Sequence, residues 1–148
     1  MIIGAGPVGG YLAKRLADRG KSVLMVEEHA QIGRPFQCAG LVNPGSMSKV
    51  GLEAVAQTRI WGARIHGPEG TLVEIGSPDR TRTWSVCRKL FDEAVVNMAI
   101  SAGAGLMLNT RPLETQVRDD HVKTTIESDG GTIPVSYTHL TLPTILLV

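Results

Sequence analysis

The sequence predicts an α/β fold that starts with a β-α-β unit on a parallel sheet and carries antiparallel hairpins as insertions. Three observations support this prediction. A glycine-rich turn separates a short apolar run from a stretch with helical periodicity. A continuous apolar run at residues 23–26 follows, as is typical of a strand buried on both faces of a sheet. Farther along, turn residues separate pairs of extended runs, which is the pattern of hairpins.

Composition places the chain among ordinary globular proteins. Of its 148 residues, 43% are hydrophobic and 20% charged, which argues against disorder and against a coiled coil. The net charge of +1, with no basic cluster, gives no electrostatic case for nucleic acid. No apolar run reaches the roughly 20 residues of a membrane helix, and no secretory signal is visible. The two cysteines form no disulfide framework, so we expect a cytoplasmic protein.

The first elements surround a G-x-G-x-x-G pattern. Residues 1–3 are predicted to be the end of a strand that starts a few residues upstream, and they run straight into the first glycine. After the pattern, Val8, Leu12 and Leu16 recur every four residues, with charged residues on the opposite face. Gly20 then stands in the C′ place, just past the predicted helix, where a left-handed conformation costs glycine little.

Each glycine of this pattern has a physical role in holding a dinucleotide. Gly4 permits the tight turn, and Gly6 lets the backbone approach a pyrophosphate. Gly9 allows the helix and the strand to pack closely. Pro7 and Val8 then begin a helix whose free N–H groups and positive dipole end face the phosphates. The pattern in this context predicts a Rossmann-like dinucleotide site.

An acidic residue closes the second predicted strand. Glu27 follows Gly4 by 23 positions, where a carboxylate binds a ribose hydroxyl and disfavours a 2′-phosphate. The neighbouring Glu28 is an alternative ribose ligand, and Glu27 is favoured. The acid at this position therefore argues against NADP.

Periodicity and turn residues predict the remaining elements. A small hairpin inserted in the crossover is expected from residues 59–65 and 71–75, with a turn at 67–70. A short extended run is expected at residues 84–86, followed by a helix at 90–102 that ends at Gly103. A third parallel strand is then expected at residues 106–108, reached by a right-handed crossover. A second hairpin is expected over residues 115–133, turning at 119–120, with the next turn at 128–131.

This arrangement resembles the FAD-binding superfamily that includes the aromatic hydroxylases. The string at residues 88–92 is similar to an R-x-x-F-D-like element that opens the next helix in that superfamily. The resemblance implies FAD as the cofactor and places Arg88 near the flavin dinucleotide.

A second string narrows the resemblance to the geranylgeranyl reductase family. Residues 32–42 contain Pro35, Cys38 and Gly40 in the P-x-x-C-x-G spacing of that family, and residues 62–68 are also similar to it. The resemblance covers residues 1–130. It adds Arg34, Cys38 and Ala39 to the candidate FAD-binding residues.

The resemblance implies an enzyme that saturates C=C bonds in isoprenoid chains of lipids. Hydride would pass from N5 of reduced flavin to one alkene carbon, and a proton must reach the other. Cys38 is the candidate catalytic residue; whether it donates the proton, shapes the pocket or only packs is left open by the sequence. The implied partners are an isoprenoid lipid substrate, an external electron donor and, through the substrate, a peripheral membrane contact.

Three other functions share features of this sequence. An FAD monooxygenase of the aromatic hydroxylase type would share the fold and cofactor but use oxygen. An NAD-dependent dehydrogenase is disfavoured by the inserted hairpin and by residues 88–92. A non-catalytic dinucleotide-binding module would bind flavin without redox cycling. The four histidines have no metal-ligand spacing, so no metal site is expected.

The end of the sequence indicates a foreign tail. Residues 135–144 resemble a translated sequencing adapter, so residues 135–148 are interpreted as read-through and residues 1–134 as the incomplete amino-terminal part of an FAD-binding domain. The second flavin motif of the superfamily is an Asp-Gly pair, and its one candidate here, Asp129 with Gly130, has the sequence of a hairpin turn. We therefore expect this chain to bind FAD weakly or not at all and to be inactive on its own.

Overall fold

The computed structural model of the chain describes residues 1–36 and 38–137, and the predicted β-α-β unit lies at its centre. Strand β1 (Ile2–Ile3) leads into α1 (Pro7–Ala17), and β2 (Leu24–Val26) then pairs with β1 in parallel. After α3 (Arg88–Ser101), β8 (Gly105–Met107) pairs in parallel with β2 and completes the strand order β1-β2-β8. The predicted parallel sheet and its α/β fold class are therefore confirmed.

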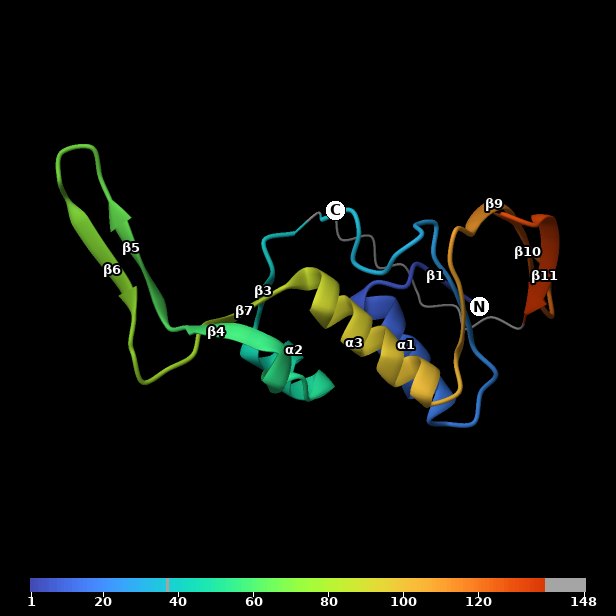
Figure 1. Cartoon of the computed structure of the whole chain (residues 1–148), viewed down its shortest axis with the longest axis horizontal. Coiled ribbons are helices and arrows are strands. Elements are labelled where there is room, and N and C mark those ends of the chain that lie inside the picture. Colours follow the sequence, from blue (N-terminus) through green and yellow to red (C-terminus); the bar gives the residue numbers. More distant parts are fainter. Residues whose placement is uncertain (37, 138–148) are drawn as a thin grey trace.

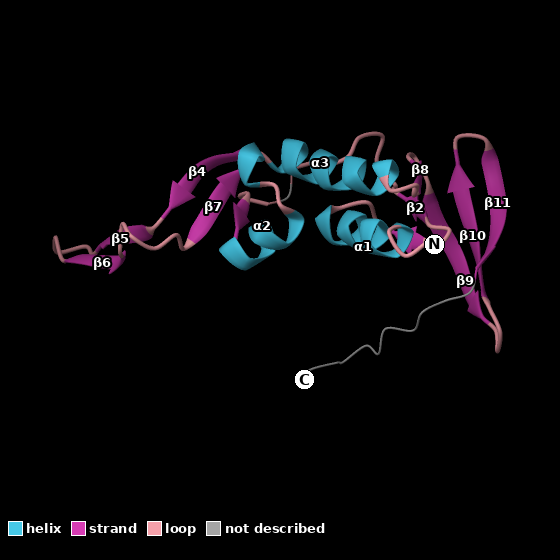
Figure 2. Cartoon of the chain, turned by 90° about the horizontal axis from the view of Figure 1, so that it is seen from below, coloured by secondary structure: helices cyan, strands magenta, loops and turns pink. Residues whose placement is uncertain are grey.

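The two long helices of this unit lie side by side in both views (Figure 1 and Figure 2). Their close approach depends on Gly10, where a Cβ atom would lie 3.1 Å from the side chains of Val95 and Val96. Beneath them, Met25 of β2 is fully buried and forms the core with Ala13 and other apolar residues. Among the described residues, no helix is long and apolar enough to cross a membrane.

The insertion between β2 and α3 is more elaborate than predicted. Strand β3 (Leu41–Val42) and strand β4 (Ala56–Ile60) both pair with β7 (Thr83–Val86), the extended run expected at 84–86. Between β3 and β4 the chain forms α2 (Pro44–Val50) and a short 3-10 turn, η1 (Glu53–Val55). Neither helical segment was predicted from the sequence.

The expected single run at residues 59–65 is wrong, because two strands of different sheets divide it. Strand β4 ends at Ile60, and β5 (Gly62–His66) pairs instead with β6 (Leu72–Gly76) as an antiparallel hairpin. The hairpin itself and its turn at residues 67–70 are confirmed. Figure 2 shows it projecting from the molecule at the end opposite the last three strands.

One face of this projecting hairpin is apolar. Residues directly opposite each other in an antiparallel pair share a face, which here joins Ala63 to Ile75 and Ile65 to Val73. All four side chains are exposed. The other face carries the ion pair of Arg64 and Glu74.

The last described strands form an antiparallel sheet in the order β11-β10-β9. Strands β9 (Arg111–Val117), β10 (Val122–Ser128) and β11 (Gly131–Tyr137) confirm both predicted turns, so Asp129 and Gly130 lie in the turn between β10 and β11. The interpretation of residues 135–148 as a tail stays a prediction. Residues 135–137 belong to β11, and residues 138–148 lie outside the described part.

Candidate functional site

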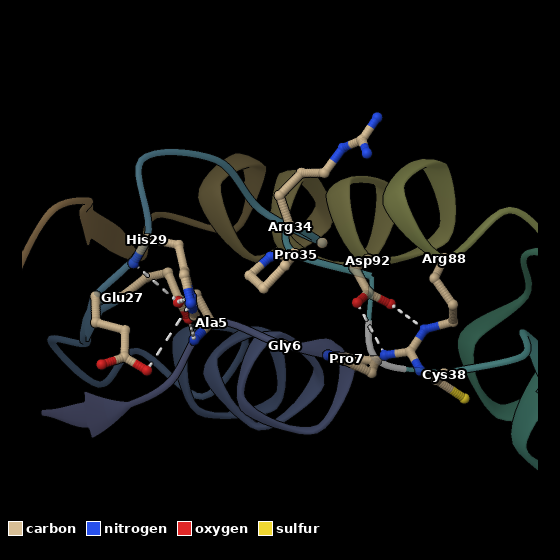
Figure 3. Close-up of a pocket in the computed structure, with 12 residues that line it drawn as sticks. Ala5, Gly6, Pro7, Glu27, His29, Arg34, Pro35, Cys38, Arg88 and Asp92 are labelled. Carbon is tan, nitrogen blue, oxygen red and sulfur yellow. Dashed lines mark hydrogen bonds and ion pairs between the residues drawn. The ribbon is translucent and has the colours of Figure 1, made fainter.

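A cavity of about 270 Å³ opens where the glycine-rich turn meets the end of β2, the loop after β2 and the start of α3 (Figure 3). The β-α-β unit contributes four of the predicted site residues: Gly6, Pro7, Glu27 and Glu28. The later segments contribute three more: Arg34, Cys38 and Arg88. Gly4, Val8, Gly9 and Ala39, which complete the predicted set, do not line the cavity.

The three motif glycines meet different surroundings. Gly4 has a φ of +90°, a conformation that other residues rarely adopt. A Cβ atom on Gly9 would lie 2.0 Å from the carbonyl oxygen of Gly4, so the helix and the turn fit together only with glycine there. A Cβ atom on Gly6 would meet nothing within 4 Å. The space beside Gly6 is therefore open on the cavity side of the turn.

The amino-terminal end of α1 lies at this open space. Gly6 is the N-cap and gives the helix no side-chain hydrogen bond, and Pro7 occupies the first turn. The first backbone N–H groups of a helix lack partners within the helix, and they carry its positive dipole end. This end of α1 is suited to an anion such as a phosphate. The side chain of Val8 is exposed and stays outside the cavity lining.

Glu27 is tied to the glycine-rich turn. Its Oε2 accepts a hydrogen bond of 2.9 Å from the Ala5 N–H, and its Oε1 accepts one of 3.2 Å from the His29 N–H. The ring Nδ1 of His29 lies 2.6 Å from the same Oε1. Burial raises the pKa of the Glu27 carboxyl, but these hydrogen bonds outweigh burial and leave the pKa below its ordinary value.

The ionised Glu27 carboxylate is therefore available as an acceptor at the cavity. Each carboxylate oxygen can accept more than one hydrogen bond, so the three protein contacts leave room for a ribose hydroxyl. Glu28 also lines the cavity, but its side chain is 64% exposed. Of the two predicted acids, Glu27 is the one held by the turn.

The loop after β2 packs against the start of α3 through two glycines. Gly33 has a φ of +71°, and a Cβ atom on it would lie 2.7 Å from Cα of Lys89. Gly40 has a φ of +76°, and a Cβ atom on it would lie 2.2 Å from the carbonyl oxygen of Val86. The Gly40 carbonyl also accepts a hydrogen bond of 2.8 Å from the Val86 N–H. These contacts bring Cys38 beside Arg88, although the two are far apart in sequence.

Arg88 joins a buried carboxylate to an exposed thiol (Figure 3). Its Nε and Nη2 donate to the two oxygens of Asp92 at 3.0 and 2.9 Å, and Asp92 is buried. The hydrogen bond to Asp92 raises the pKa of the Arg88 guanidinium. The Gly40 N–H, and after it the Arg88 guanidinium, hold the pKa of the Cys38 thiol below its ordinary value.

The remaining predicted residues differ in their placement. Arg34 stacks its guanidinium over the Phe36 ring at 3.9 Å, and Figure 3 shows it pointing away from Arg88. Ala39 is exposed and lies outside the cavity lining. Asp129, in its turn, accepts a hydrogen bond of 2.8 Å from the Asn109 side chain and also lies outside this cavity.

Two side chains of the site were not singled out by the sequence. The spacing of the histidines indicated no role for His29, yet it lies two residues after Glu27 and contacts that carboxylate. Asp92 was noted only as part of a motif, although it follows Arg88 by four positions, the spacing of an ion pair on one helix face. That spacing could have identified the Asp92 contact from the sequence.

Known proteins resemble this chain in sequence and in fold. The family model for an NAD(P)-binding Rossmann-like domain matches residues 2–61. A digeranylgeranylglycerophospholipid reductase from Methanosarcina acetivorans is 35% identical over 131 residues, which covers 83% of this chain and 31% of that protein. The chain therefore spans about a third of the length of the curated relatives it matches.

Solved structures show the same fold. A geranylgeranyl bacteriochlorophyll reductase-like protein from Thermoplasma acidophilum superposes with a TM-score of 0.80 at 24% identity, covering 90% of this chain and 35% of that one. The flavin-dependent monooxygenase PieE, solved with FAD and substrate, superposes with a TM-score of 0.78 at 19% identity, covering 94% and 28%. By sequence the chain is similar to digeranylgeranylglycerophospholipid reductases over most of its length, and it carries a Rossmann-like dinucleotide-binding fold.

Proposed function

We propose that this chain forms part of an FAD-dependent reductase that saturates C=C bonds in geranylgeranyl chains of lipids, and that its cavity holds the dinucleotide of FAD. The observation that carries the proposal is the meeting of the glycine-rich turn, Glu27 and Arg88 around one cavity. The chain's relatives named digeranylgeranylglycerophospholipid reductase support the reductase assignment. FAD would supply the hydride for the alkene.

The residues present suit that cofactor. The open space beside Gly6, at the amino-terminal end of α1, suits the pyrophosphate, with Gly4, Pro7, Val8 and Gly9 building the turn and the helix start. We assign the ribose to Glu27, with Glu28 as the second acid.

The loop and the start of α3 form the other side of the cavity. Arg88 offers a positive charge there, and Cys38 an exposed thiol of lowered pKa. Arg34 and Ala39 of the same loop complete the proposed site. In the complete enzyme we further propose an isoprenoid lipid as substrate, an external electron donor, and a cytoplasmic location with peripheral membrane contact through that lipid.

The Gly6→Ala variant tests the cofactor assignment. A Cβ atom at this position meets no protein atom, so the fold should be unchanged, but it occupies the space assigned to the pyrophosphate. The Kd for ADP, which represents the adenosine half of FAD, is expected to rise roughly tenfold or more. Titration of the ¹⁵N-labelled 148-residue chain with ADP measures this change, because NMR detects weak binding.

Gly130→Ala is the matched control. Gly130 also has open space around it and no left-handed φ, but it lies in the turn between β10 and β11. It should bind ADP as the wild type does. Equal affinity of the Gly6→Ala variant and the wild type would contradict the assigned pyrophosphate position, and a complete enzyme that binds no FAD would contradict the cofactor assignment itself.

The second candidate function is that of an FAD-dependent monooxygenase, because the chain shares its fold with the flavin-dependent monooxygenase PieE. The Cys38→Ser change in the complete enzyme separates the two. For a reductase we expect FAD to stay bound and alkene reduction to fall, because serine cannot supply a thiol of lowered pKa at the cavity. Turnover is measured as saturated product from a geranylgeranyl lipid.

Oxygen uptake by the wild-type complete enzyme is the accompanying measurement. Substrate-dependent oxygen consumption without alkene reduction would favour the monooxygenase. Flavin that never cycles between its oxidised and reduced forms in the presence of a reductant would indicate a non-catalytic binding module. Unchanged alkene reduction in Cys38→Ser would remove that residue from the chemistry while keeping the reductase.

A further inference from the structure

Both the backbone and the ring of His29 contact the Glu27 carboxylate. Glu27 Oε1 receives both the backbone N–H of His29, at 3.2 Å, and the ring Nδ1, at 2.6 Å. The Glu27 side chain is only 13% exposed, whereas the His29 side chain is 37% exposed. The His29 ring is therefore partly exposed to solvent, while the carboxylate that it contacts is mostly buried.

The donor direction in this contact follows from the charge on Glu27. An ionised carboxylate can only accept hydrogen bonds, so Nδ1 of His29 must carry a proton. Its Nε2 then lies on the other side of the ring, 4.0 Å from Oε1 of Glu28. The His29 carbonyl oxygen accepts a hydrogen bond of 3.2 Å from the Asn109 N–H just after β8, which holds the residue in place.

Each of the two Glu27 oxygens is thus held by a different residue. The Ala5 N–H holds Oε2 on the glycine-rich turn, and His29 holds Oε1. A free glutamate side chain has three rotatable bonds, and each must be fixed before the carboxylate can meet a ribose hydroxyl in one geometry. With His29 in place, that ordering is complete before any ligand arrives.

We infer that His29 is a positioning residue that orients Glu27 for the ribose of a bound dinucleotide and thereby sets the affinity of the site. The inference rests on the proposed FAD site and extends it to a residue outside the predicted set. His29 acts through Glu27 and through the Nδ1 proton. The backbone N–H of residue 29 remains when alanine, asparagine or glutamine replaces His29, so these variants isolate the contribution of the ring.

The test compares His29→Ala, His29→Asn and His29→Gln in the 148-residue chain, with ADP as the probe. An asparagine amide nitrogen reaches the position of Nδ1, whereas the glutamine amide lies one carbon farther out. We expect the Kd for ADP to rise roughly three- to tenfold in His29→Ala and His29→Gln and to stay near the wild-type value in His29→Asn.

A second readout follows Glu27 itself. Because His29 is one of the groups that lower the pKa of the Glu27 carboxyl, its titration monitored by ¹³C NMR should shift upward in His29→Ala and much less in His29→Asn. A general loss of structure would not be reversed by asparagine alone. His29 is partly exposed, so all three variants are expected to fold.

The outcomes separate this inference from the proposed function. Equal or tighter ADP binding in His29→Ala overturns the positioning role, while a weakened Gly6→Ala variant still supports the dinucleotide site. A Kd in His29→Asn as high as in His29→Ala also overturns it, because the Nδ1 donor would then be irrelevant. If the wild-type 148-residue chain shows no saturable ADP binding, the same variants are compared in the complete enzyme, where absence of ADP binding overturns both.

Discussion

Replacing Gly9 by alanine is expected to destabilise the chain by about 2–3 kcal/mol, the upper part of the range for overpacked positions. The added Cβ atom would lie 2.0 Å from the Gly4 carbonyl oxygen and 3.3 Å from Cγ2 of Ile2. The closest atom belongs to the backbone, so no side-chain rotation relieves the overlap, and α1 must move away from β1. Urea unfolding followed by far-UV circular dichroism measures the loss.

Gly6→Ala is the control for Gly9→Ala within the same turn. Its Cβ atom meets no protein atom, so its free energy of unfolding should match that of the wild type within about 0.5 kcal/mol. The pair separates the two roles in the motif, since Gly9 is needed for packing and Gly6 for ligand approach. Equal stability of the Gly9→Ala variant and the wild type would contradict the close packing of helix and turn.

Replacing Asp92 by alanine is expected to cost about 2–3 kcal/mol of folding free energy, somewhat less than the 3–5 kcal/mol for breaking a fully buried ion pair. The Asp92 side chain is 6% exposed and that of Arg88 is 22% exposed, so the truncation leaves a largely desolvated guanidinium without its acceptor. The same urea titration reports the loss. Because Asp92 no longer orients the Arg88 guanidinium, the hydrogen bond between Arg88 and Cys38 should also weaken.

Glu93→Ala provides the matched control on the next residue of α3. Lys89 and Glu93 form an ion pair at the same four-residue spacing, but at 3.5 Å and with both side chains about one-third exposed. Exposed helix pairs of this kind contribute roughly 0.3–0.5 kcal/mol. Equal losses of stability in the two variants would contradict the prediction that burial makes the Arg88–Asp92 ion pair contribute more than the exposed Lys89–Glu93 pair.

The β-α-β unit could be predicted from sequence because its signals are local. The spacing of Gly4, Gly6 and Gly9, the helical period after them and the apolar run at residues 23–26 all lie within one short segment. Each of these signals favours a β-α-β unit, and the structure confirms it with the parallel pairing of β1 and β2. The third parallel strand was found for the same reason, since the helical period before it ends at Gly103.

Elements that depend on partners far away in sequence were harder to predict. Residues 59–65 divide at Trp61 because β4, before it, pairs with β7, whereas β5, after it, pairs with β6. Neither pairing partner can be recognised from the local sequence pattern. Helix α2 did carry a local signal. Asn43 caps it by accepting the Ser46 N–H at 2.8 Å, and Gly51 follows it with a φ of +67°.

The candidate site divides in the same way. Glu27 and the glycines were identified by position, whereas Arg88 and Cys38 were assigned to the site only through resemblance to a family, and their contact was not predicted. It depends on Gly33 and Gly40 packing against the start of α3, which is a tertiary contact. His29 was missed because a single histidine beside two acids has no spacing that distinguishes it from a surface residue.

The β5–β6 hairpin has a practical consequence for anyone who purifies this chain. Within the described residues it forms a two-stranded sheet, so each strand has a free backbone edge beside the exposed apolar face of Ala63, Ile65, Val73 and Ile75. Free edges and exposed apolar side chains together drive strand-to-strand association. We therefore expect residues 62–76 to promote association of the chain in a concentrated sample. Lysine substitutions on that apolar face are expected to reduce this association.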